Sequence, residues 1–464
     1  MMRSFISPVL LFCVLSFLWA DEKTYSFELV SRVELPTVIW SVGDTAGGSD
    51  CWGYVDNEGT DYAIMGVLDG TAIVRAEDQK IITTVPGPEN GDQYYHRDMM
   101  TYGDYLYVCH EMTGTNQGIQ IIDLSPLPDS VRYVTSYDEV DYDGAYATTS
   151  HNLFVDEATA TLYLVRSNYS GFRVVSLDDP ENLKEIGVAE TPGIHDLFSR
   201  KDTVFVAEGY NNSFSIWDAT DKENGPKLLE RVNVPGAGYV HTVWTTEDGR
   251  YLMTAEETAN KTVKMWDIRD YDDIELVGEY LGASKLAHNI HIKDDLAFIS
   301  HYATGVTVVD ISDPTDLREI ARYDTFIAHD QSTFYGAWGV YPYSPNGYVY
   351  ASSVEGYLDI LKFREESNTI SEETLLPSKV SISQNYPNPF NGETFLSISL
   401  SEEVSVKLEI YNALGVRITT IADGRFPAGQ YSFNWNGATV PSGIYFARLF
   451  AERADKTVKM LLLK

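Results

Sequence analysis

Residues 287–314 read AHNIHIKDDLAFISHYATGVTVVDISDP, and this stretch carries the pattern that decides the fold. An alternating run meets an Asp-Asp turn, a second apolar run meets a Gly-containing turn, and a third run ends at Asp310. Runs rich in β-branched and aromatic residues, separated by Gly and Asp turns, are typical of antiparallel strands. We therefore expect three strands here and a fourth at REIARYDT, residues 318–325.

The same four-strand unit recurs on both sides of this stretch. Its third strand is predicted at residues 118–125, 171–178, 213–220, 262–269 and 305–312. Further units at either end bring the total to seven, and a spacing of about 45 residues is that of four-stranded propeller blades. The sequence therefore predicts an all-β fold whose main part is a seven-bladed β-propeller.

The seventh unit lacks a fourth strand of its own, because Arg364 opens an acidic stretch directly after the third strand. Residues 27–35, FELVSRVEL, resemble the fourth strands of the other units. We expect this N-terminal strand to complete the last blade, which closes the ring and removes exposed sheet edges.

Both ends of the chain are predicted to lie outside the propeller. Residues 1–20 have a positive start, an apolar core and Ala20 before Asp21, as in a secretory signal peptide. No later apolar stretch is long enough to cross a bilayer. We expect the propeller at 21–363, an acidic linker at 364–377, and a small immunoglobulin-like β-sandwich at 378–464, where alternating segments are separated by turn residues.

The charge of the chain excludes some partners. The formal net charge is −34 over 464 residues. Nucleic-acid binding needs Lys and Arg to neutralise phosphates, and an anionic membrane surface would repel this chain. The acidic residues are expected to keep an exported protein in solution.

The repeat region resembles a known family. Residues 25–363 are similar to the propeller of the choice-of-anchor B proteins, which carry LVIVD-type repeats. The resemblance implies a surface-associated propeller and assigns no reaction, because the activity of that family is largely unassigned. The matching segments are GTDYAIMGVLDGTAIV, GIQIIDLS, SHNLFVDEATATLYLV, VHTVWTTEDGRYL, residues 287–314 and GAWGVYPYSPNGYVYASS.

The C-terminal region resembles the type A sorting domain of the type IX secretion system. The motifs are NYPNPFN (385–391), YNALG (411–415), SGIYFARL (442–449) and KTVKMLLLK (456–464), with Gly392 and Glu393 in place of the usual proline and small residue. The resemblance implies that residues 378–464 engage the type IX secretion machinery and that the protein is secreted or held at the outer cell surface. An ordinary adhesive sandwich is the alternative.

Histidines recur where the first strand of a blade begins. These positions lie ten residues before Phe205, Tyr251 and Phe298 of the second strands, or twelve before Tyr163. Because first strands line the channel of a propeller, we expect the aligned side chains to gather at one mouth. From the first blade to the seventh they are Trp52, Arg97 with His96 adjacent, His151, His195, His241, His288 and Trp338.

Two interpretations of this pattern remain open. In the first, a divalent transition metal is bound by the neutral imidazoles of His151, His195, His241 and His288. Glu208, His301 or His96 would assist. Alternatively, each histidine donates a hydrogen bond that caps its own strand, as repeats often do. We expect a wide channel, in which one ion reaches only two or three of the rings.

The sequence favours three functions in turn. The first is a module that binds a glycan, protein or other ligand at the histidine-lined face. The second is a metal-dependent hydrolase, lyase or oxidoreductase at the channel mouth. The third is a structural surface component without a small-molecule site. No motif assigns a catalytic residue.

Two cysteines remain once Cys13 has left with the signal peptide. Cys51 and Cys109 either form a disulfide, which an oxidising compartment permits, or stay as two buried thiols.

Overall fold

The computed structural model describes residues 24–41, 44–88, 96–112, 114–138, 149–166, 168–222, 224–326, 331–366, 380–382, 385, 388, 390–400, 403–412, 416–427, 429–451 and 454–464. All regular elements in these ranges are β-strands, so the predicted all-β class is confirmed. Within the same ranges, no helix has the length and apolar character needed to cross a membrane. The predicted signal peptide and most of the predicted acidic linker fall on residues that are not described.

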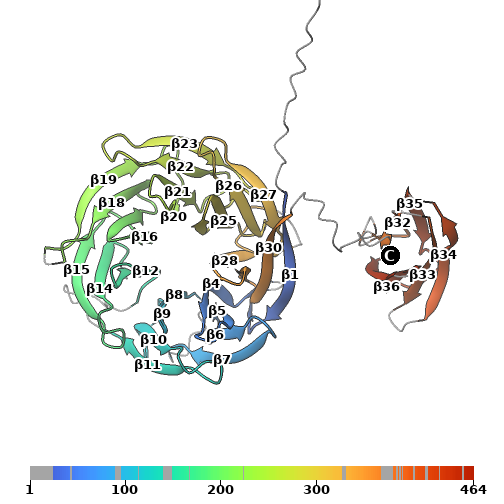
Figure 1. Ribbon diagram of the computed structural model, residues 1–464, viewed down its shortest axis with the longest axis horizontal. Helices are drawn as coiled ribbons and strands as arrows, with labels where there is room; N and C mark the ends of the chain where they lie inside the picture. The colour runs from blue at the N-terminus through green and yellow to red at the C-terminus, as the bar shows by residue number, and fades with distance from the viewer. Residues whose placement is uncertain are drawn as a thin grey trace, which may run out of the picture. The chain divides into compact units, whose positions relative to one another are not determined.

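In the described chain, seven four-stranded antiparallel sheets surround a central axis, as Figure 1 shows. The innermost strands of blades one to seven are β4 (Gly48–Val55), β8 (Asp98–Tyr102), β12 (Leu153–Asp156), β16 (Asp196–Arg200), β20 (Val240–Thr245), β24 (Ile290–Lys293) and β28 (Ala337–Tyr341). The second strands are β5 (Asp61–Val67), β9 (Tyr105–Cys109), β13 (Thr161–Val165), β17 (Thr203–Ala207), β21 (Tyr251–Glu256), β25 (Leu296–Ser300) and β29 (Tyr348–Ser353).

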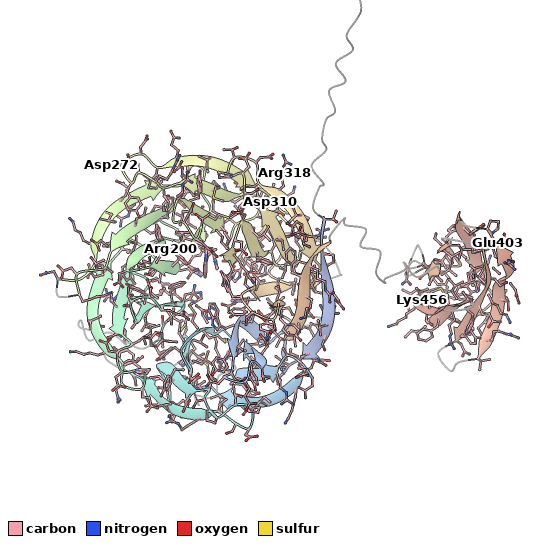
Figure 2. The ribbon with its side chains drawn as sticks, in the orientation of Figure 1. Arg200, Asp272, Asp310, Arg318, Glu403 and Lys456 are labelled. Carbon is pink, nitrogen blue, oxygen red and sulfur yellow. The ribbon has the colours of Figure 1, made fainter. Side chains whose placement is uncertain are left out.

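The outer half of each blade follows the predicted repeat. The third strands are β6 (Gly70–Arg75), β10 (Ile119–Asp123), β14 (Gly171–Ser176), β18 (Ser213–Asp218), β22 (Val263–Asp267), β26 (Val306–Asp310) and β30 (Tyr357–Glu366). The fourth strands are β7 (Lys80–Pro86), β11 (Arg132–Tyr137), β15 (Lys184–Glu190), β19 (Lys227–Asn233), β23 (Glu275–Tyr280), β27 (Arg318–Tyr323) and, in blade seven, β1 (Thr24–Glu34). A short pair, β2 (Val38–Ser41) and β3 (Asp44–Ala46), lies between β1 and β4 in the chain. Figure 2 shows Arg200 of β16 towards the channel, and Arg318 of β27 on the outer rim.

The N-terminal strand closes the ring as predicted. β1 pairs antiparallel with β30, from Thr24 opposite Glu366 to Glu34 opposite Tyr357. Inside this pair, Arg32 Nε donates to Asp359 Oδ1 at 2.7 Å, and Arg32 Nη2 donates to Asp359 Oδ2 at the same distance. The bidentate geometry adds a charge-assisted contact to the backbone ladder of the closing strand.

Local chemistry explains why the repeat holds its shape. The Asp that ends a third strand accepts the backbone N–H two residues further on, as Asp218 does from Thr220 at 2.9 Å and Asp310 from Ser312 at 2.9 Å. Such turns are a preferred role for Asp between strands. Aromatic side chains then join neighbouring blades, and Trp217 packs edge-on against Phe172 with centroids 5.7 Å apart.

The C-terminal part forms a separate compact unit, residues 369–464. It is a β-sandwich of two antiparallel sheets with its own core of residues such as Leu396, Leu408 and Met460. One sheet holds β31 (Val380–Ile382), β32 (Glu393–Leu400) and β35 (Gly429–Asn436). The other holds β33 (Val404–Asn412), β34 (Arg417–Phe426), β36 (Gly443–Ala451) and β37 (Ala454–Leu462).

The two cysteines are not joined, which corrects the disulfide considered from the sequence. Cys51 and Cys109 are free, buried thiols on β4 of blade one and β9 of blade two. Their sulfur atoms have different partners: Cys51 Sγ lies 3.7 Å from the carbonyl oxygen of Tyr350, and Cys109 Sγ lies 3.4 Å from that of His151. Each thiol therefore packs as a small apolar side chain between blades.

Candidate metal centre

The blade-start histidines are positioned by the first hydrogen bond of each inner hairpin. The His195 N–H donates to the Ala207 carbonyl at 2.8 Å, and the His288 N–H donates to the Ser300 carbonyl at 3.0 Å. These carbonyls belong to the ends of the second strands β17 and β25. The histidine side chains of several blades are thereby brought to the same end of the channel.

Six side chains form a closed ring at this end. In the part of the chain that is described, neighbouring ring centroids lie 3.9–5.6 Å apart. The members, in order around the ring, are His96, His151, His195, His241, His288 and Trp338. The expectation of a wide channel is wrong at this level, because the aromatic rings contact one another. The void that they line has a volume of about 10 Å³.

Blade one contributes no member to this ring, which corrects the placement of Trp52. Trp52 pairs with Ile64, whereas in blade four Phe198 pairs with Phe205, so Trp52 corresponds to Phe198 and lies three residues deeper than His195. Its ring packs on Tyr341 with centroids 4.9 Å apart. The turn between β4 and β5 is longer than the turn between β16 and β17, because Val55 pairs with Asp61 whereas Arg200 pairs with Thr203.

One group of three side chains has the arrangement expected of metal ligands. His241 Nε2 lies 3.9 Å from Glu257 Oε2, and His288 Nε2 lies 4.0 Å from Glu257 Oε1. The three potential ligand atoms all lie within 4.8 Å of one another. These distances are too long for direct hydrogen bonds. They leave space for an ion between the two imidazoles and the carboxylate.

Backbone carbonyls fix the orientation of two rings. His288 Nδ1 donates to the Trp338 carbonyl at 2.6 Å, and His195 Nδ1 donates to the His241 carbonyl at 3.1 Å. A proton on Nδ1 leaves Nε2 with its lone pair. Metal-binding histidines commonly show this pattern, because the second hydrogen bond sets the tautomer.

A second group lies elsewhere on the ring. His151 Nδ1 is 3.3 Å from Glu111 Oε2, and the His151 ring stacks on His96 with centroids 4.0 Å apart. One ligand atom from each of these three residues falls within the same 4.8 Å limit. In each group a tyrosine of the following blade donates to the glutamate, Tyr169 to Glu111 and Tyr302 to Glu257.

Burial favours the neutral form of four histidines of the ring. Loss of solvent lowers the pKa of His288 to about 3, and it lowers the pKa values of His96, His195 and His241 well below the usual range. Burial also raises the pKa of the Glu257 carboxyl. The neutral imidazole is the form that binds metal, so His241 and His288 need no deprotonation before they bind an ion.

Carboxyl and amide side chains lie next to the ring. Asp50, Asp98, Asn152 and Asn289 line the void together with the histidines. Asp98 Oδ2 accepts from the Leu153 N–H at 3.1 Å, and Asp196 Oδ2 accepts from the Thr242 hydroxyl at 2.7 Å. Burial, followed by the charge of Asp98, raises the pKa of Asp196 to about 7. These acids join the inner strands of neighbouring blades.

Glu208 and His301 do not reach the ring. Arg231 Nε donates to Glu208 Oε2 at 2.9 Å, and the Ser284 hydroxyl lies 2.8 Å from His301 Nδ1. Both therefore stabilise their own part of the propeller. The sequence alignment did not include Glu257, and its neighbour Glu256 is buried against Lys264. Met253 of blade five pairs with the middle of the third strand, as Phe205 does in blade four, so the equivalent of Glu208 is Glu256, and Glu257 lies one residue further on.

Comparison with known proteins identifies two parts of the chain. Residues 384–464 match the secretion system C-terminal sorting domain, and residues 285–325 match the LVIVD repeat. No curated protein matches the chain. Among solved structures, the computationally designed Ika8 protein is similar at 12% sequence identity and a TM-score of 0.44, over 68% of this chain and 82% of that one.

The fold and these matches define a class, a β-propeller repeat protein with a sorting domain at its C-terminal end. More particularly, the chain carries an LVIVD repeat in blade six and a sorting domain of the type IX secretion system, with whose machinery that domain interacts. It is secreted to the cell surface or the exterior.

Proposed function

We propose that this protein is a choice-of-anchor B propeller that binds a divalent transition-metal ion outside the cell. His241, His288 and Glu257 hold the ion. The LVIVD match in blade six supports the family assignment. One observation carries the function: two imidazole Nε2 atoms lie 3.9 and 4.0 Å from the two oxygens of one carboxylate. Two donors at about 2.0–2.2 Å from one tetrahedral ion stand about 3.3–3.6 Å apart, so the three side chains need to close by less than about 1 Å to hold an ion.

The donor set selects the kind of ion. Two imidazoles and one carboxylate suit Zn²⁺, Cu²⁺ or Ni²⁺ better than Ca²⁺ or Mg²⁺, which prefer oxygen ligands. A void of about 10 Å³ next to the ring has room for a water-sized species and none for an organic molecule. The geometry therefore favours ion binding over catalysis inside the channel.

A metal-dependent hydrolase is the second candidate. Two histidines and one glutamate leave a coordination position open, as in catalytic zinc sites. The Glu257 side chain is 19% exposed, so the open position is reachable from the mouth. Capture of a glycan or a protein at the same face is the competing function without metal.

Elemental analysis of the secreted protein, purified without chelators or a histidine tag, tests the proposal. We expect at least one equivalent of a transition metal, of which Glu257→Gln and His288→Ala each remove one. His301→Asn is the matched control, because it deletes a buried imidazole away from the ring and should leave the metal content unchanged. A well-folded protein that is metal-free and takes up no added Zn²⁺ would sink the proposal and favour glycan or protein binding.

A further inference from the structure

We infer that the propeller binds a second ion, held by His96, His151 and Glu111. The inference rests on the proposed function for the chemistry of the ion, and it uses separate residues. His96 begins blade two, His151 begins blade three, and Glu111 follows the second strand of blade two. Their potential ligand atoms all lie within 4.8 Å of one another, as do those of His241, His288 and Glu257.

The two groups lie on opposite sides of the six-membered ring. His96 and His151 are adjacent members, as are His241 and His288. His195 separates the pairs on one side, and Trp338 separates them on the other. One ion therefore cannot be shared between the two glutamates, and each group needs an ion of its own.

The tyrosines indicate that the presence of two His–His–Glu groups does not follow simply from the blade repeat. A strand cap inherited from the repeat would place equivalent residues at equivalent positions. Instead, Tyr302 lies two residues after the end of β25, whereas Tyr169 lies four residues after the end of β13. Both hydroxyls nevertheless donate to the glutamate of the preceding blade. The turns after β13 and β25 differ in length, yet each places a tyrosine hydroxyl on a glutamate of the preceding blade.

Both tyrosines also occupy an unfavourable backbone conformation. Their φ angles are 54° at Tyr169 and 43° at Tyr302, in the left-handed region. Residues other than glycine are uncommon there, and such strain persists where the surrounding structure holds it, often at binding sites. Here the strain directs each phenol to a glutamate that faces two histidines.

The two sites differ in access to solvent. The exposed fractions are 29% for the Glu111 side chain and 17% for that of His151, against 19% for Glu257 and 3% for His241. Water therefore reaches the second site more easily. We expect its ion to leave first when a chelator is added.

Zinc titration of the metal-depleted, full-length protein tests the inference, with bound zinc measured by calorimetry and elemental analysis. Wild type and His301→Asn should bind two equivalents, Glu111→Gln and Glu257→Gln one each, and the double variant none. The Glu→Gln changes keep an oxygen for the tyrosine hydroxyl, and circular dichroism at each step verifies the fold. Release to a chelator should be biphasic, and Glu111→Gln should remove the faster phase.

The outcomes separate the two proposals. One equivalent in the wild type, removed by Glu257→Gln and unaffected by Glu111→Gln, overturns the second site and leaves the proposed function standing. One equivalent removed by either variant means a single shared ion and also overturns it. One equivalent removed by Glu111→Gln alone rejects the first site, and no bound zinc at all rejects both.

Discussion

At the scale of single residues, the tyrosine–glutamate contacts are expected to control ion binding at the two proposed metal sites. Tyr302 donates to Glu257 and orients the carboxylate towards His241 and His288. Such second contacts typically change metal affinity by about 10–100-fold. We expect Tyr302→Phe to weaken zinc binding by about that factor at the Glu257 site.

Competition with a chelator of known affinity measures this change. Tyr169→Phe is the matched control, because it removes the same hydroxyl from Glu111 and should leave the Glu257 site unaltered. Equal zinc affinities in wild type and Tyr302→Phe would contradict the prediction.

His291 gives a pH prediction away from the proposed ligands. It is buried against Trp244 with centroids 4.5 Å apart, and burial lowers its pKa to about 3. The unfolded chain binds the proton near pH 6.5, so unfolding takes up a proton at lower pH, and stability falls from about pH 6.5 towards 3. One such histidine lowers the free energy of unfolding by about 2 kcal/mol between pH 6.5 and 5.

We therefore expect His291→Phe to lose less stability than wild type over this interval. Urea unfolding at pH 6.5 and pH 5 measures the difference within each protein, so a change in packing cancels. Identical losses in the two proteins would show that His291 is protonated in the folded state.

At the scale of elements, the β1–β30 pair carries a testable ion pair. Asp359 is buried and its partner Arg32 is one-third exposed, so Arg32→Ala leaves a carboxylate without its cation. Breaking such a pair costs about 3 kcal/mol or more. Arg364→Ala is the control within the same pair of strands, because Arg364 and Glu28 are both exposed and their ion pair contributes about 1 kcal/mol or less. Urea unfolding should separate the two variants, and equal losses would contradict this account.

Strand pattern was predictable and strand register was not. The third strands and the closing strand follow from local composition, because alternation, turn residues and the final Asp are all visible in the sequence. Trp52 was misplaced because the turn of the inner hairpin is longer in blade one, where Val55 pairs with Asp61, than in blade four, where Arg200 pairs with Thr203. A turn rich in glycine and aspartate does not reveal from its sequence how many residues it contains, so the register of the next strand stays undetermined.

At the scale of the whole molecule, six of the seven blades each supply one side chain to the ring, and among the described residues blade one supplies none. His96 meets Trp338 only because blade two and blade seven lie on either side of blade one, whose buried Ser49 and Asp50 leave the ring position open. This contact depends on closure of the propeller, so neither the blade count nor the spacing of the histidines could predict it. The sorting domain was predictable because its motifs are local in the sequence.

The two compact units lead to a prediction for a shortened chain. Residues 1–368 and 369–464 have separate cores. We expect a chain that ends at residue 368 to keep the circular dichroism spectrum of a propeller and the zinc stoichiometry of the full protein. Loss of either would mean that residues 369–464 contribute to the fold or to the sites.

The closing strand also sets the order in which the molecule is completed. Thr24 pairs with Glu366, so the last blade cannot form until nearly the whole propeller sequence is available. Early blades can assemble from neighbours in the chain, but the contact between His96 and Trp338 must wait for this final pairing. A finished channel mouth is therefore a late event in folding. If the two proposed sites bind ions, an exported chain would take those ions from the compartment in which it finishes folding.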